Sequence, residues 1–155
     1  MLHYEQCVAV KRYKLGNEHA ETLASVNNLA SLLSKMDRRG QENAESLFRE
    51  VLSTKRRLLG GSHSDTLILI GNLGALLIKM GQYCEAEYLL REVLYARRCS
   101  LGNKHLSTLV TVGNLGSLLM SKGQDKEAEP LYVEAEVGCR QLLGQCHPET
   151  LSAIK

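Results

Sequence analysis

An internal repeat with a period of about 42 residues is the strongest constraint on what this chain can fold into. Four histidines mark it at intervals of 44, 42 and 42 residues: His19, His63, His105 and His147. A Leu-Gly pair precedes each histidine, and a Thr-Leu pair follows it. A period of this length is typical of arrays in which one small supersecondary unit stacks on the next.

The sequence of each repeat predicts two helices. In the second repeat, apolar residues recur at helical spacing from about Thr66 to Lys79 and again from about Cys84 to Cys99. Gly102 follows the second helix, where a left-handed C-cap favours a residue without a Cβ atom. The chain has only 2 prolines, which also favours helices. We therefore predict an all-α fold of antiparallel helix hairpins.

The repeat divides the chain into one array of successive segments. We expect an orphan second helix at 1–15, repeats at 16–59, 60–101 and 102–143, and the start of a further repeat at 144–155. The first repeat has two extra residues between Leu33 and Ala44, where a loop would absorb them.

Both ends of the array carry apolar residues without a capping partner in the sequence. These are Tyr4, Cys7 and Val8 at one end, and Leu151 and Ile154 at the other. Repeat arrays normally carry polar caps. We therefore expect a fragment of a longer array, with end-to-end self-association through the uncapped repeats as one candidate interaction.

Composition argues against several function classes. A net charge of +2, 5% aromatic residues and no tryptophan do not favour nucleic-acid binding. No apolar run approaches the roughly 20 residues that cross a membrane. The five cysteines are odd in number and form no C-x-x-C pair, so we expect reduced thiols, a cytoplasmic location and no metal site. No nucleophile–base spacing or phosphate-binding glycine loop suggests catalysis or a cofactor.

Three segments carry a resemblance to a known family: "LGNEHAETLASVNNLASLL", "LGGSHSDTLILIGNLGALLIKMGQYCEAEYLLREVLYARR" and "LGNKHLSTLVTVGNLGSLLMSKGQDKEAEPLY". The pattern resembles the tetratricopeptide repeat, in the 42-residue form found in kinesin light chains. The resemblance implies a right-handed superhelical α-solenoid that acts as a non-catalytic protein-interaction module. It would bind an extended peptide of a cargo or adaptor partner in a concave groove. Contact with kinesin heavy chain would require regions absent from this sequence. The alternative is a regulatory or structural spacer within a larger signalling or nucleotide-binding protein.

Asparagines in register are the predicted ligand contacts. They are Asn28, Asn72 and Asn114, with Asn27 beside the first, and each ladder asparagine precedes an apolar leucine on the first helix of its repeat. An amide offers two donors and an acceptor to a peptide backbone. Lys35 and Lys79 follow seven residues later, about two turns down the same face, and would attract an acidic side chain or a terminal carboxylate. The alternative is that the asparagines bind neighbouring backbone and only hold the stack together.

Two further ladders are interpreted as structural. The histidines precede each first helix and are expected to contact its free N–H groups. Arginines recur late in each second helix, at Arg12, Arg56, Arg98 and Arg140. Compensation of the helix dipole is the favoured explanation for them, and a basic stripe for an acidic partner is the alternative.

Overall fold

The computed structural model describes residues 2–143, and the side chains of residues 3–142. The chain divides after Gly81 into two compact units, each of which is considered by itself. The predicted parts of the array that fall on 144–155, including His147, lie outside the described residues.

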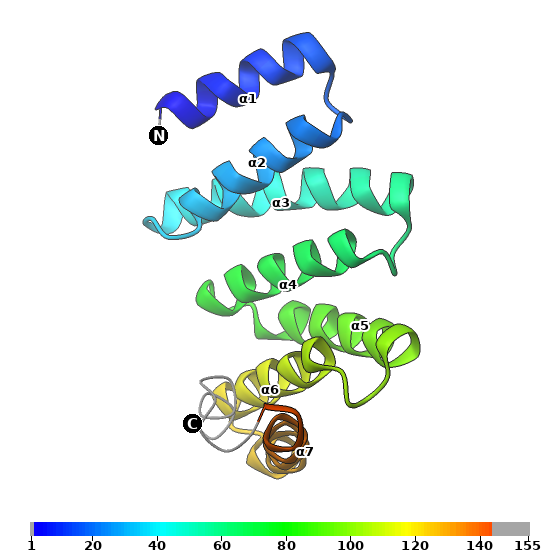
Figure 1. Ribbon diagram of the computed structural model, residues 1–155. Helices are drawn as coiled ribbons and strands as arrows, with labels where there is room; N and C mark the ends of the chain where they lie inside the picture. The colour runs from blue at the N-terminus through cyan, green and yellow to red at the C-terminus, as the bar shows by residue number, and fades with distance from the viewer. Residues whose placement is uncertain (1, 144–155) are drawn as a thin grey trace. The chain divides into compact units, whose positions relative to one another are not determined.

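The first unit contains four helices, and successive helices in the chain pack side by side (Figure 1). They are α1 (Leu2–Leu15), α2 (Ala20–Leu33), α3 (Arg38–Leu59) and α4 (Ser64–Lys79). The core of this unit lies between α2, α3 and α4, where Ala30, Ala44, Phe48 and Val51 are at most 1% exposed. On α1, Val8 is buried, whereas Tyr4 and Cys7 are exposed.

The second unit contains three helices in the residues that the structure describes. They are α5 (Tyr83–Leu101), α6 (Leu106–Ser121) and α7 (Asp125–Leu143), and α6 packs against both of the others. Between residues 2 and 143 there is no β-strand, so the predicted all-α fold of helix hairpins is confirmed. The predicted helices at about 66–79 and 84–99 correspond to α4 and α5.

The histidines begin the first helix of each described repeat. The Nδ1 atoms of His19, His63 and His105 accept hydrogen bonds from backbone N–H groups two residues later, at 3.3, 3.2 and 3.1 Å respectively. Each histidine has an extended backbone and occupies the N-cap position. This confirms the prediction that the histidines contact the free N–H groups of the first turn.

Glycines end the second helices in the predicted conformation. Gly60 and Gly102 have φ values of 88° and 84°, in the region that disfavours residues with a Cβ atom. Their N–H groups donate to the carbonyl oxygens of Arg56 and Arg98 at 3.0 and 3.2 Å. The chain can therefore turn sharply into the next repeat.

The two extra residues of the first repeat are placed differently from the prediction. Helix α3 has 22 residues, whereas α5 and α7 have 19 each, and α2 has 14 residues, whereas α4 has 16. The first repeat therefore ends its first helix earlier and begins its second helix earlier, and the prediction that a loop alone absorbs the two residues is wrong. The cause is Asp37, whose carboxylate accepts the N–H of Gly40 at 3.0 Å and caps the extended helix. Gly40 is required there, because a Cβ atom would lie 2.7 Å from the Cβ of Met36.

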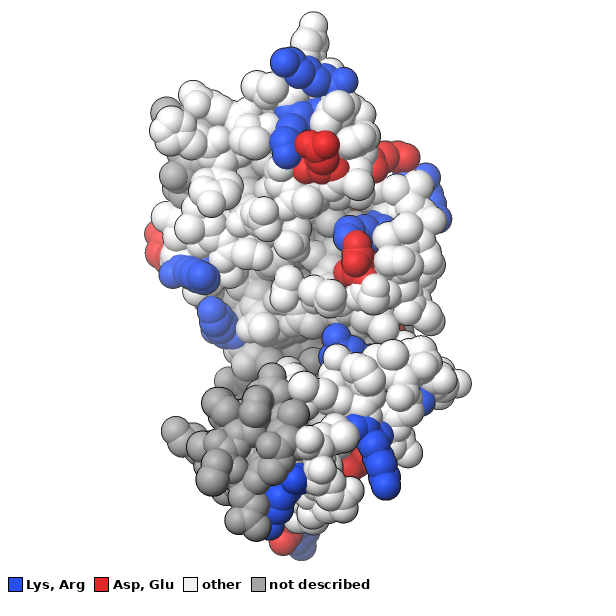
Figure 2. Space-filling model, viewed as in Figure 1, with Lys and Arg blue, Asp and Glu red and all other residues white. Residues whose placement is uncertain are grey.

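The arginine ladder connects second helices of successive repeats. Arg12 on α1 donates to both carboxylate oxygens of Glu50 on α3, at 2.7 and 2.8 Å. Arg98 on α5 donates to both oxygens of Glu134 on α7, each at 2.7 Å. Both arginines lie in the last turn of their helices, as dipole compensation requires, and each also binds a glutamate of another helix, so neither is part of a free basic stripe. On the face drawn in Figure 2, basic and acidic side chains lie next to one another at several places.

A second ion-pair cluster in the second unit predicts a measurable dependence of stability on pH. Glu87 on α5 accepts hydrogen bonds from Lys122 and from Arg91, and these bonds, the Lys122 bond first, hold the pKa of Glu87 below its ordinary value of 4.5. Because the pKa of Glu87 is lower in the folded state than in the unfolded state, its ionised carboxylate stabilises the fold. This stabilisation is complete at pH values above the pKa of the unfolded state, and it is lost as the pH falls through the pKa of the folded state.

We expect Glu87→Gln to lower the melting temperature at pH 7 and to reduce the loss of stability on acidification below about pH 4.5. Thermal denaturation between pH 7 and pH 3 measures both effects. Glu129→Gln is the matched control, because Glu129 is an exposed carboxylate in the same unit. An acid-dependent loss of the same size in Glu87→Gln and in the wild type would contradict this assignment.

Candidate functional site

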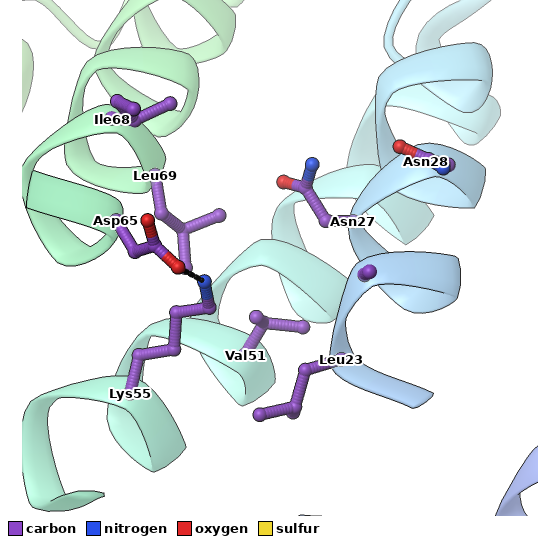
Figure 3. A pocket seen from close by; sticks show the side chains of 9 residues that line it. Leu23, Asn27, Asn28, Val51, Lys55, Asp65, Ile68 and Leu69 are labelled. Atoms are coloured by element: carbon purple, nitrogen blue, oxygen red, sulfur yellow. Dashed lines mark hydrogen bonds and ion pairs between the residues drawn. The ribbon is translucent and has the colours of Figure 1, made fainter. Parts of the chain in front are cut away.

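A pocket with a volume of about 200 Å³ opens between the two first helices of the first unit (Figure 3). Helices α2 and α4 form its sides, and α3 forms its base. It is lined by Leu23, Ala24, Asn27, Asn28, Val51, Lys55, Asp65, Ile68 and Leu69. First helices were predicted to line the ligand groove, and the pocket lies between two of them.

The base of the pocket is apolar. Leu23, Val51 and Leu69 are at most 4% exposed and belong to the core of the unit. Ile68 is 55% exposed and adds an apolar surface at the rim. The pocket therefore offers burial to an apolar group without requiring a new cavity in the core.

Two adjacent asparagines provide the polar groups of the α2 side. Asn27 points from α2 into the gap toward α4 (Figure 3), and its Oδ1 atom is buried without a hydrogen-bond donor from the protein. Asn28 lines the same pocket and is exposed. A buried acceptor without a donor costs free energy, which a ligand N–H group would recover.

An ion pair provides the charged groups of the pocket. Lys55 on α3 donates to the Asp65 carboxylate on α4 at 2.8 Å, and this hydrogen bond lowers the pKa of Asp65 (Figure 3). The same register position one repeat earlier holds Lys11, which pairs with Glu21 at 3.4 Å. Sequence reasoning missed these residues, although the ten-residue spacing between the lysine and the carboxylate recurs in both repeats.

The other predicted contacts lie outside this pocket. Lys79 is the last residue of α4 and Lys35 follows the end of α2, both exposed, whereas the pocket is lined by residues 23–28 of α2 and 65–69 of α4. Asn72 on α4 is half-buried and does not line the pocket, and Asn114 is exposed on α6 in the second unit. The structure thus brings Asn27 and Asn28 together, and neither lysine joins them. Lys122, which follows Ser121 in the third repeat, binds Glu87 instead.

A second hollow with a volume of about 420 Å³ lies in the second unit, between α7 and the turn after α5. Val133, Val137 and Leu109 give it mainly apolar walls. Asn114 does not line it, and no side-chain atom in it is buried without a hydrogen-bond partner. We therefore assign the candidate site to the α2–α4 pocket.

Metal binding and membrane insertion find no support in the part of the chain that the structure describes. Between residues 2 and 143, no three histidine, cysteine or acidic side chains gather at one point. None of the described helices combines the length and the hydropathy that a membrane crossing requires.

Each repeat of about 42 residues forms a pair of helices, and a pocket lies between two successive first helices. This arrangement is that of a helical-repeat scaffold for protein interaction. Residues 38–98 and 70–141 match the family model of the tetratricopeptide repeat, which together covers more than half of the chain. The chain belongs to the tetratricopeptide repeat family. No curated protein sequence matches it.

Solved structures place the repeats in the kinesin light chain-like type. A putative kinesin light chain of Podosopora anserina with nearly identical repeats has a TM-score of 0.81 and 27% identity, over 97% of this chain and 70% of that one. A single-residue variant of the same protein gives a TM-score of 0.82 and 28% identity over the same shares. BtubC (BKLC) of P. vanneervenii has a TM-score of 0.80 over 94% of this chain and 57% of that one, and its 24% identity supports the fold alone.

Proposed function

We propose that this protein binds an extended peptide segment of a partner protein, and that the α2–α4 pocket is part of the binding groove. The observation that carries the proposal is the side chain of Asn27, which lines the pocket and whose Oδ1 atom has no hydrogen-bond donor in the protein. A peptide backbone N–H group would supply that donor. The exposed amide of Asn28 would bind a second peptide group beside it.

The pocket would select an apolar side chain next to those backbone contacts. Leu23, Val51 and Leu69 form a preformed apolar base, so an entering side chain gains burial while little order is lost. Asn72, Asn114, Lys35 and Lys79 would extend the contacts along the peptide, as the register of the repeat suggests. The role is non-catalytic, and cargo or adaptor binding in the cytoplasm follows the kinesin light chain-like character of the repeats.

Peptide selection from a random display library on the purified chain tests the proposal. We expect wild-type protein to enrich a common peptide pattern. The double variant Asn27→Ala, Asn28→Ala should weaken binding of a selected peptide by about tenfold to a hundredfold, because each amide contributes about 1 kcal/mol when it is hydrogen-bonded. Isothermal titration calorimetry measures the change.

The matched control is Asn17→Ala, which removes an exposed amide from the turn before α2, outside the pocket. We expect it to bind the selected peptide as the wild type does. Melting temperatures of all variants report on the alternative role of the asparagines. A large loss of stability in the double variant, with no selected peptide for the wild type, would indicate a scaffold without this binding function.

A further inference from the structure

The hollow of about 420 Å³ in the second unit has an exposed apolar wall on α7. Val133 and Val137 lie one helical turn apart and line the hollow, and they are 53% and 47% exposed. The residues at the same register positions of the two preceding second helices are mainly polar: Arg49 and Ser53 on α3, and Arg91 and Tyr95 on α5. The pair of exposed valines is thus particular to α7 among these three helices. A hollow with exposed apolar walls is typical of a surface that binds another molecule.

A glycine gives this hollow its apolar base. Gly138 lines it, at a register position where α3 has Thr54 and α5 has Ala96. A Cβ atom on residue 138 would lie 2.5 Å from Cδ2 of Leu109, which is closer than two side-chain carbons can approach. The glycine therefore allows Leu109 of α6 to lie directly against α7.

The rim of the hollow lacks an ion pair that the first unit forms at the same register positions. In the first unit, Glu18 in the turn before α2 binds Arg57 of α3. In the second unit these positions hold Lys104 and Gln141, and both residues line the hollow. Lys104 is exposed and pairs with no acidic side chain in the part of the chain that the structure describes. The rim therefore carries an amide and an uncompensated positive charge.

Lys104 gives the hollow its electrostatic preference. The other charged residue that lines it is Glu134, and both of its carboxylate oxygens already accept hydrogen bonds from Arg98, each at 2.7 Å. The charge of Glu134 is thus compensated within the protein, whereas that of Lys104 is available to a partner. Charge complementarity favours a partner with an acidic group beside an apolar surface.

We propose that this hollow is a second protein-interaction site, and that its occupant is an amphipathic helix of a partner protein. The apolar stripe of that helix would lie on Val133 and Val137, with an acidic residue beside the stripe facing Lys104. The two valines are four residues apart and form a ridge along α7, and a helix with apolar residues three and four positions apart packs against such a ridge.

This site differs in kind from the α2–α4 pocket. It is formed by a second helix and the turn between two repeats, whereas the α2–α4 pocket lies between two first helices. It would bind a helix, whereas the α2–α4 pocket is proposed to bind an extended segment. The inference therefore goes beyond the proposed function and does not depend on it.

Selection from a display library of helical peptides on the purified full chain tests the inference. Each library member carries a fixed apolar stripe at helical spacing and random residues beside it. Selected peptides are kept when they bind the double variant Asn27→Ala, Asn28→Ala as tightly as the wild type, because such peptides do not depend on the α2–α4 pocket. We expect the kept peptides to carry aspartate or glutamate at one position beside the stripe.

Two substitutions remove the apolar ridge. Val133→Arg and Val137→Ser give α7 the residues that α3 carries in register, so both are compatible with a second helix of this fold. We expect each to weaken binding of a kept peptide about tenfold or more, because this is the contribution expected from burial of a valine side chain. Isothermal titration calorimetry measures the affinity. The matched control is Val10→Ser, which changes an exposed valine on α1, outside the hollow, and should bind as the wild type does.

Lys104→Glu tests the charged contact separately from the apolar one. We expect the library to enrich lysine or arginine on this variant, at the peptide position where the wild type enriches acidic residues. Lys126→Glu makes the same change in net charge at an exposed lysine of α7 outside the hollow, and it should retain the acidic preference. An acidic preference that persists in Lys104→Glu would mean that the partner's acidic residue does not face Lys104.

The inference is wrong if no helical peptide is kept, or if Val133→Arg and Val137→Ser bind the kept peptides as tightly as Val10→Ser does. Two results would assign the hollow to another occupant and overturn the inference. They are binding to phosphatidylserine vesicles that Val137→Ser abolishes, and a dimer in sedimentation equilibrium that Val133→Arg dissociates, each without a kept peptide. The proposed function of the α2–α4 pocket would stand in all of these cases.

Discussion

Ala24→Arg will reduce the affinity for a library-selected peptide by at least about a hundredfold while leaving the fold intact. Ala24 lines the α2–α4 pocket and is exposed, so a long side chain there projects into the space that the peptide side chain would use. The loss of the apolar contact and the desolvation of the new cation both oppose binding, and about 1.4 kcal/mol corresponds to each tenfold. Isothermal titration calorimetry with the selected peptide measures the affinity.

Ala9→Arg is the control for this substitution. Ala9 is also an exposed helical alanine of the first unit, but it lies on α1 and does not line the pocket. We expect it to bind the peptide with wild-type affinity. If Ala24→Arg binds as tightly as Ala9→Arg, with both proteins folded by circular dichroism, the α2–α4 pocket is not the peptide site.

Phe48→Ala will have the largest effect on stability, lowering the free energy of unfolding by about 3–5 kcal/mol. Phe48 is 1% exposed on α3 and is the largest fully buried side chain of the first unit. Its removal leaves a cavity that the rigid helix packing fills only in part. Urea denaturation followed by circular dichroism measures the loss, which is a large fraction of the stability of an ordinary domain.

The matched control is Tyr13→Ala, which removes an aromatic ring that is 92% exposed on α1. We expect its midpoint of urea denaturation to stay close to that of the wild type. A loss in Phe48→Ala no larger than that in Tyr13→Ala would mean that α3 does not carry the core of the first unit.

The fold could be predicted from the sequence because its determinants recur in register. Histidine caps, terminal glycines and the apolar stripes of α4 and α5 are local signals, and each appears several times in the chain. The place of the two extra residues of the first repeat was predicted wrongly, because it depends on a single capping contact. The sequence shows Asp37, but only the structure shows that its carboxylate binds the N–H of Gly40 and extends α3.

The candidate site was predicted less completely, because a pocket depends on how neighbouring helices are spaced. The pattern of apolar and polar residues along the first helix of the repeat identified Asn27 and Asn28 as groove residues, and both line the pocket. It could not identify Lys55 and Asp65, which come from two other helices and meet only in the folded unit.

The pairing of Arg12 and of Arg98 with a glutamate of the following repeat also bears on how such chains can grow. In both ion pairs, Arg12–Glu50 and Arg98–Glu134, the arginine lies on one hairpin and the glutamate on the next hairpin. A hairpin that carries both such an arginine and such a glutamate can be duplicated in frame, or moved to a new place in the array, and still join its neighbours on either side. Evolution by tandem duplication therefore requires no compensating change at the new junction.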